Sequence, residues 1–107
     1  MATGILGTPT SMPGSTLTTI YTVPADTFAV LTVNICNRGS TDATVRLATS
    51  ALDTPTNAEY VEYGTTILPG GVLERSGIVL DATKKIVAWS DSTDVSVVAY
   101  GIETATA

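Results

Sequence analysis

The stretch FAVLTVNICN, residues 28–37, alternates between two kinds of side chain at every second position. A period of two over this length is typical of a β-strand with one face against a core. The side chains expected to share one face are those of Ala29, Leu31, Val33 and Ile35, and the opposite face carries Val30, Thr32, Asn34 and Cys36. This stretch therefore predicts a strand rather than a helix.

Outward from it, the same pattern recurs in short segments that end at turn residues. The expected strands cover residues 16–23, 28–37, 43–50, 59–68, 72–80, 85–90 and 95–103, with Ser76-Gly77 as a candidate interruption. A single helical turn is expected at 53–58, where Asp53 or Thr54 would cap it and Pro55 suits its first position.

Turn signals about every 8–12 residues, without alternating helices, are typical of antiparallel sandwiches. The fold class predicted for residues 16–107 is therefore all-β. We expect a single antiparallel β-sandwich of seven or eight strands, with either a jelly-roll or an immunoglobulin-like topology.

Residues 1–15 differ from the rest, because five of them are Gly or Pro and none has a charged side chain. This composition predicts an extended N-terminal arm, and its apolar side chains suggest that it docks on another surface. The arm residues expected at an interface are Ile5, Leu6, Pro9, Met12 and Pro13. On this hypothesis, a chain without the arm would still fold.

The strand expected at 95–103 is apolar on both faces. Antiparallel strands with one face in water normally alternate more cleanly. We therefore expect the side that carries Val98 and Tyr100 to be covered by the arm, by a loop or by a neighbouring subunit.

Charge argues against two classes of partner. Five basic and ten acidic residues give a net charge of −5, whereas nucleic-acid binding depends on Lys and Arg that neutralise phosphates. The N-terminus lacks the features of a signal peptide, and no run of about 18 apolar residues could span a bilayer. We expect synthesis in a cytoplasm, with no nucleic-acid or membrane partner.

The chain has no histidine, which removes the commonest general base and the commonest transition-metal ligand. Cys36 is the single cysteine and has no imidazole partner, so packing is its expected role. Glu59 and Glu62 are expected on opposite faces of a strand, and the Asp91–Asp94 segment is expected to be a plain turn rather than a calcium loop. We predict that the protein is not an enzyme and has no cofactor or metal.

Two tyrosines remain as candidates for binding. In a regular strand Tyr60 and Tyr63 would lie on opposite faces, so that one of them is exposed. An exposed tyrosine could stack on a sugar or lie in a protein interface, where tyrosine is enriched.

Four segments, in order, carry a resemblance to known proteins: YTVPA (21–25), VNICNRG (33–39), AEYVEY (58–63) and GVLERSGIVL (71–80). Over residues 16–103 the chain resembles small β-sandwich virion structural proteins of tailed bacteriophages, particularly phages of cyanobacteria and marine bacteria. That group includes proteins of the capsid exterior and pieces of tails or fibres.

The resemblance implies a virion protein, most simply a capsid decoration (cement) protein that contacts the major capsid protein or other virion proteins. A homo-oligomer, with a trimer favoured, would be consistent with such a role. The alternatives are a tail, neck or fibre component, and a receptor- or carbohydrate-binding module that uses Tyr60 or Tyr63.

Overall fold

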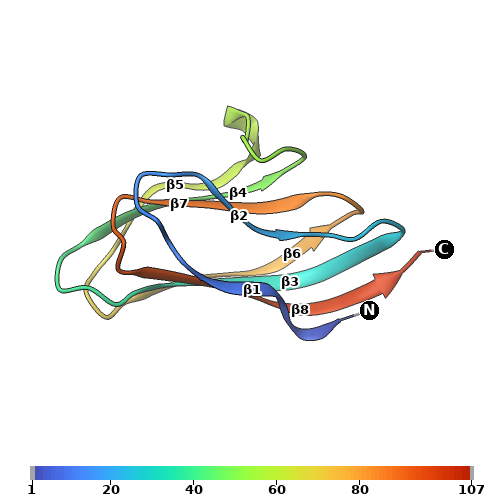
Figure 1. Ribbon diagram of the computed structural model, residues 1–107, viewed down its shortest axis with the longest axis horizontal. Helices are drawn as coiled ribbons and strands as arrows, with labels where there is room; N and C mark the ends of the chain where they lie inside the picture. Colours follow the sequence, from blue (N-terminus) through green and yellow to red (C-terminus); the bar gives the residue numbers. More distant parts are fainter. Residues whose placement is uncertain (1, 107) are drawn as a thin grey trace.

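The computed structural model describes residues 2–106 and contains eight strands (Figure 1). They are β1 (Thr3–Ser11), β2 (Thr18–Thr22), β3 (Thr27–Asn37), β4 (Ala43–Ser50), β5 (Tyr60–Ile67), β6 (Val72–Leu80), β7 (Lys85–Ser90) and β8 (Val95–Ala105), with a 3-10 turn η1 (Asn57–Glu59) before β5. The predicted all-β fold is confirmed.

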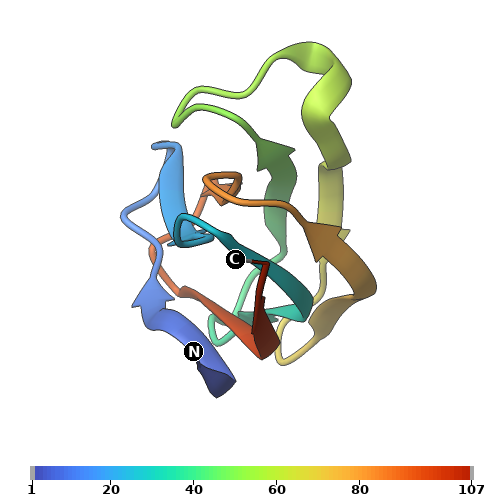
Figure 2. The same ribbon diagram turned by 90° about the vertical axis from the view of Figure 1, so that its right-hand side faces the viewer.

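The strands form two antiparallel four-stranded sheets that face each other (Figure 2). Sheet A has the order β1-β8-β3-β6, and sheet B has the order β2-β7-β4-β5. The first strand pairs with the last, β2 with β7, β3 with β6, and β4 with β5. This nested pairing is the topology of an eight-stranded jelly roll, so the structure decides between the two topologies that the sequence left open.

The core lies between the sheets and is filled by the inward side chains of both. In β3 the predicted alternation is confirmed, since Ala29, Leu31, Val33 and Ile35 are all buried. Their outward neighbours are partly or well exposed. Burying a Val or Leu side chain contributes about 1.5–3 kcal/mol, so this alternation fixes which face of each sheet is turned inward.

The N-terminal segment is extended, as predicted, but it is a strand of the sandwich rather than an arm outside it. β1 pairs with β8 along the edge of sheet A, with Leu6 opposite Ala99. Leu6 is 1% exposed and Met12 is 2% exposed, and both belong to the core. The sandwich therefore begins at Thr3, and these two side chains are not available to another protein.

A bulge explains how a strand tolerates so much Gly and Pro. The pairing moves from Leu6–Ala99 to Thr10–Val97, so residues 7–9 face a single residue of β8. Pro9 has no N–H to donate to a neighbouring strand and is therefore suited to such an irregular position.

A second bulge lies at Ser76-Gly77, where the sequence suggested an interruption. Leu31 pairs with Ile78 and Val33 pairs with Arg75, which leaves two residues of β6 opposite Thr32. Gly77 has a φ of 71°, a left-handed conformation that favours glycine in a bulge. The strand bends here but continues to Leu80.

One buried polar side chain closes an end of the sandwich. Asn37 is fully buried and donates from Nδ2 to the carbonyl oxygens of Thr41 (2.8 Å) and Ile67 (2.9 Å). Its Oδ1 accepts from the backbone N–H of Gly39 at 2.9 Å. Because its amide is hydrogen-bonded, the side chain can be buried without a large desolvation penalty.

Candidate functional site

The outer face of sheet A carries a group of exposed apolar side chains. Cross-strand rows place Val30 between Ile102 and Val79, and place Ile5 beside Tyr100. Six of the nine exposed large hydrophobic residues lie here: Ile5, Val30, Val72, Val79, Tyr100 and Ile102. We call these six residues the sheet A patch.

The sheet A patch contains almost no charge. Among the outward positions of the described strands of sheet A, Glu74 carries the only charged side chain. Its Oε2 accepts a hydrogen bond of 3.0 Å from the Tyr100 hydroxyl, which reaches across β3. This hydrogen bond raises the pKa of Tyr100. This polar contact crosses the middle of the face, so Asn34 and Glu74 separate Val72 from the other five patch residues.

The sequence predicts that the side of β8 that carries Val98 and Tyr100 is covered. Val98 and Tyr100 lie on the outer face, as expected, but β1 lies beside β8 and not over it. Within residues 2–106, no loop covers the patch either, since Val79 is 65% exposed and Ile102 is 47% exposed.

Sheet B differs, because a segment of the chain lies over part of its outer face. Residues 51–59, which we call the β4–β5 strap, project from sheet B on the side away from sheet A (Figures 1 and 2). Ala48 and Val87 are outward neighbours on β4 and β7, yet neither is exposed. The strap and adjacent side chains therefore shield this part of sheet B.

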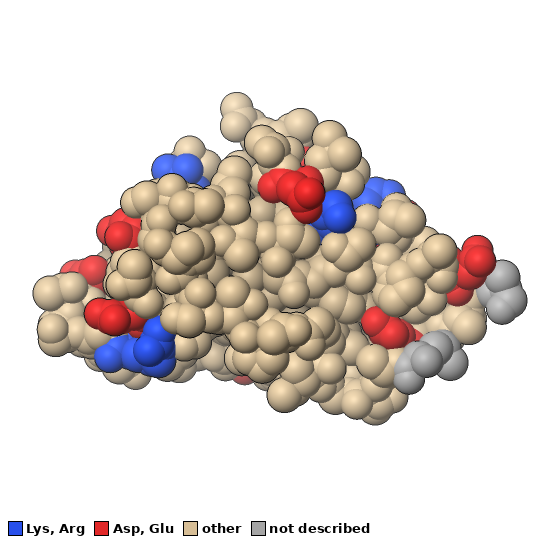
Figure 3. All heavy atoms as spheres, viewed as in Figure 1, with Lys and Arg blue, Asp and Glu red and all other residues tan. Residues whose placement is uncertain are grey.

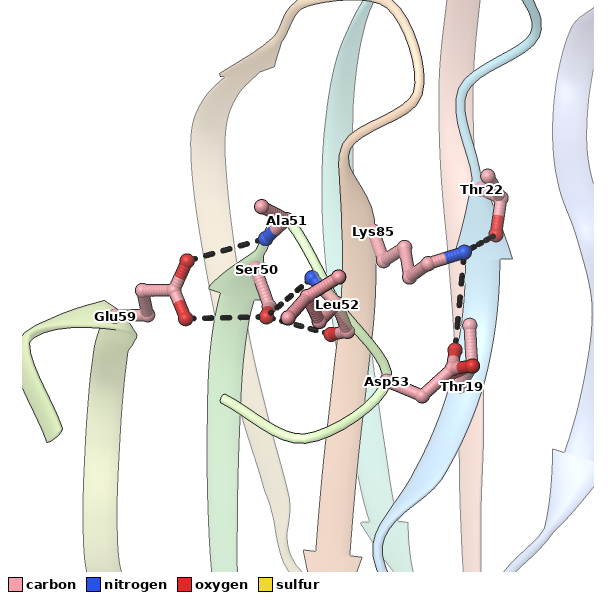
Figure 4. A network of polar contacts seen from close by, with 8 residues as sticks. All are labelled: Thr19, Thr22, Ser50, Ala51, Leu52, Asp53, Glu59 and Lys85. Carbon is pink, nitrogen blue, oxygen red and sulfur yellow. Dashed lines mark hydrogen bonds and ion pairs between the residues drawn. The ribbon is translucent and has the colours of Figure 1, made fainter. Parts of the chain in front are cut away.

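Two carboxylates hold the strap in place (Figure 4). Asp53 Oδ1 accepts from the Thr19 hydroxyl at 2.5 Å and lies 3.7 Å from Lys85 Nζ. Glu59 accepts from the backbone N–H groups of Thr56 (2.8 Å) and Ala51 (3.1 Å), and these bonds lower its pKa.

The helical turn predicted at 53–58 is correspondingly displaced. It forms as η1 (Asn57–Glu59), and Asp53 does not cap it. The physical reason is that Asp53 finds partners on β2 and β7, which are distant in sequence.

Beside the strap, a row of stacked side chains crosses three strands of sheet B. The Arg46 guanidinium lies 4.3 Å from the Trp89 ring centroid and 4.5 Å from that of Tyr63. Within residues 2–106, Arg46 makes no hydrogen bond or ion pair, and its buried Nε has no acceptor. The cation is held between two rings by cation–π contacts alone.

Tyr60 and Tyr63 lie on the same face of β5, which corrects the expectation that they lie on opposite faces. The reason is a bulge: Glu62 pairs with Leu47 and Tyr60 with Ala48, which leaves Val61 as an extra residue. The two rings are 5.0 Å apart at 84°. With Asn57 they line an open hollow of about 430 Å³.

The interface residues predicted from the sequence are thus distributed over separate places. Ile5, Val98 and Tyr100 meet on sheet A, Tyr60 and Tyr63 meet on sheet B, and Pro9 and Pro13 are exposed near β1. Leu6 and Met12 belong to the core. The exposed position of Val79 and the stacking of Arg46 with Trp89 were not predicted from the sequence, whereas Ile102 lies on the face of 95–103 that was expected to be covered. Alternation within 72–80 could have indicated the position of Val79.

The described residues contain no catalytic constellation that we recognise. No group of three or more His, Cys, Asp or Glu side chains within residues 2–106 could hold a metal ion. Within the same range, no helix has the length and apolar character needed to cross a membrane. On the side seen in Figure 3, the charged side chains form small separate groups rather than a continuous basic surface.

Comparison with known proteins gives no family model, no curated protein and no solved structure that matches this chain.

Proposed function

We propose that this chain is a non-enzymatic structural protein of a tailed-phage virion, which assembles into a symmetric cluster and decorates the capsid. The observation that carries the proposal is the exposed sheet A patch. The virion location is carried over from the sequence-based expectation for residues 16–103, and the jelly roll is an architecture that viral capsid domains use. Fold alone does not assign function, so the surface is the main argument.

The patch has the composition of an interface core. Such cores are depleted of charged residues and enriched in aromatic side chains, and Glu74 is the only charge among the outward positions described. Exposed apolar groups that form a contiguous surface normally mark a site of association. We therefore assign the patch to a protein–protein contact.

The partner that fits the patch best is a second copy of this chain. Two such faces meet without burying a cation or a large number of carboxylates. Elsewhere the net charge of −5 makes copies repel each other, which favours self-association through sheet A, where Glu74 is the only charged outward side chain described. A closed cluster, with a trimer favoured, would then present its remaining surfaces to the major capsid protein.

A cement protein stabilises a shell because it binds the assembled state and not the separate subunits. The sequence-based hypothesis placed the capsid contact on the N-terminal residues. Leu6 and Met12 are buried, so they are not part of that contact. Ile5, Pro9 and Pro13 remain exposed on or near β1 and stay candidates for contact.

The experiment mixes purified chain with phage heads that lack it, followed by sedimentation of the heads and quantification of the bound protein. We expect saturable binding at a copy number approaching that of the capsid protein, and heads that resist heat better than undecorated ones. A tail, neck or fibre component, the alternative within the virion, would give only a few copies per particle. Absence of the chain from virions would reject both.

A further inference from the structure

We infer that the outer face of sheet B binds an acidic saccharide in the hollow lined by Asn57, Tyr60 and Tyr63, with Arg46 as the partner of the carboxylate. This site is independent of the sheet A patch, because it lies on the other sheet. It also does not depend on where in a virion the chain is placed.

The first observation is that Arg46 lacks a polar partner. The other four basic side chains of the chain all have polar partners: Arg38 with Ser11, Arg75 with Glu62, Lys84 with Asp81, and Lys85 with Asp53 and Thr22. Arg46 has none within residues 2–106, although the chain has an excess of carboxylates. Arg46 does not line the hollow itself, but its guanidinium carbon lies 4.5 Å from the centroid of the Tyr63 ring, which does, and we assign it to an anionic group of the ligand.

The stacking determines how that site would be used. Tyr63 and Trp89 flank Arg46 on the two neighbouring strands, each with its ring centroid within 4.5 Å of the guanidinium carbon. Because Nε is buried, the two Nη groups are the donors assigned to a ligand. A carboxylate binds the edge of a guanidinium through parallel hydrogen bonds.

The second observation is the pair of tyrosine rings that line the hollow. Tyr60 and Tyr63 stand at 84° to each other, and Tyr63 is 63% exposed. The C–H face of a pyranose ring can pack on such a tyrosine, while hydroxyl groups of the sugar reach the Asn57 amide. The volume of about 430 Å³ lies within the range of ligand pockets, roughly 300–1,000 Å³.

Other ligand classes fit less well. A cation, which aromatic corners often bind, would be repelled by Arg46, which already lies 4.5 Å from the Tyr63 ring centroid. A nucleic acid would need several phosphate contacts, and the site offers a single basic side chain. The saccharide carrying a carboxylate satisfies both the rings and the guanidinium.

The test titrates the purified full chain with a trisaccharide of galacturonic acid and, separately, with its neutral methyl ester, followed by NMR of the Tyr60 and Tyr63 ring resonances and by calorimetry. We expect the acid to bind and to shift both rings, with affinity that falls as salt is added. Tyr63→Ala should weaken binding by about tenfold. Leu68→Ala, at a 65% exposed position that belongs neither to the lining of the hollow nor to the sheet A patch, is the control and should change nothing.

Arg46→Gln separates the two parts of the inference. It should abolish the preference for the acid over its ester while both still bind weakly. Asn57→Ala is a second variant, at an exposed position where no unfolding is expected, and it should weaken both ligands. Equal binding of acid and ester by the unaltered chain would overturn the role of Arg46. Absence of ring shifts with either trisaccharide would overturn the site.

Discussion

Gly101 lies on β8 directly against the backbone of β3. A Cβ atom at this position would lie 2.0 Å from the carbonyl oxygen of Val30 and 2.7 Å from the Leu31 Cα. Both are backbone atoms, so no side chain can rotate to make room. We predict that Gly101→Ala lowers the free energy of unfolding by about 3 kcal/mol, the upper part of the usual range for overpacking, measured by urea denaturation.

Gly77→Ala is the matched control for Gly101→Ala. Nothing lies within 4 Å of its added Cβ, but its φ of 71° disfavours alanine. A left-handed conformation alone costs about 1–2 kcal/mol. If the two variants lose the same stability, the close approach of β3 and β8 is not what requires glycine at position 101.

Glu103 predicts how stability depends on acid. Its carboxylate accepts from the Tyr21 hydroxyl and from the backbone N–H of Ala2 (2.9 Å), and these two bonds, in that order, lower its pKa. The unfolded chain, with the ordinary pKa of 4.5, therefore binds this proton first. Stability contributed by Glu103 is complete above that pH and is lost as the pH falls through the lower, folded value.

We therefore expect the free energy of unfolding to fall between about pH 5 and pH 3, and to fall less steeply in Glu103→Gln. The variant should also be less stable at neutral pH. Tyr21→Phe, which removes the stronger donor, should flatten the same acid limb. The free energy of unfolding is measured by urea denaturation at each pH. If its slope against pH is unchanged in both variants, the Tyr21–Glu103 contact does not lower the pKa of Glu103.

At the scale of the element, the question for β1 is whether it is needed for folding or only contacts another protein. We predict that a chain lacking residues 2–15 does not fold, because it loses two core side chains and leaves the edge of β8 unpaired. NMR dispersion and near-ultraviolet circular dichroism measure this directly. A folded truncated domain would restore the arm hypothesis.

A neighbouring pair of substitutions in β1 gives a finer test of the same point. Leu6→Ala removes a buried side chain and should cost about 2–5 kcal/mol. Ile5→Ala, one position away on the outer face and 58% exposed, should cost no more than about 0.5 kcal/mol. Similar losses for the two would mean that β1 does not lie in the register described.

The elements also show where sequence patterns work and where they fail. β4, β6 and β7 have the predicted bounds, because period-two alternation is local and turn residues mark its ends. β1 was missed because residues 7–9 break the period, and only pairing with β8 makes the segment a strand. Tyr60 and Tyr63 were misplaced for the same reason, since the bulge at Val61 is set by pairing with β4.

At the scale of the whole molecule, topology and sites depend on contacts distant in sequence. The jelly-roll order requires β1 to find β8 and β2 to find β7, which no local window can specify. Arg46 and Trp89 lie on different strands and meet only because β4 pairs with β7. The sequence could therefore predict the sandwich and an apolar β8, but neither the stacked row on sheet B nor the extent of the patch on sheet A.

If the sheet A patch is the contact between copies of the chain, a charge placed in it should disrupt the oligomer. If identical copies meet through it, an aspartate at the β8 end of the Ile102–Val30–Val79 row would be buried at each contact without a partner. Removing a carboxylate from water in this way costs several kcal/mol, so Ile102→Asp should convert the oligomer to monomers. Sedimentation velocity and native mass measurement report the change, and the unaltered chain should have the mass of a trimer.

Leu52→Asp is the matched control for Ile102→Asp. Leu52 is 67% exposed, so it is at least as accessible as Ile102, but it lies on the β4–β5 strap, away from sheet A. The substitution adds the same charge to the chain and should leave the oligomer intact. Dissociation by both variants would trace the effect to net charge, whereas an unaltered chain that stays monomeric at high concentration would assign the patch to a different partner. Because Ile102 lies in β8 and Leu52 in a loop, a urea denaturation curve of each variant first checks that both are folded, and the comparison then tests the apolar surface.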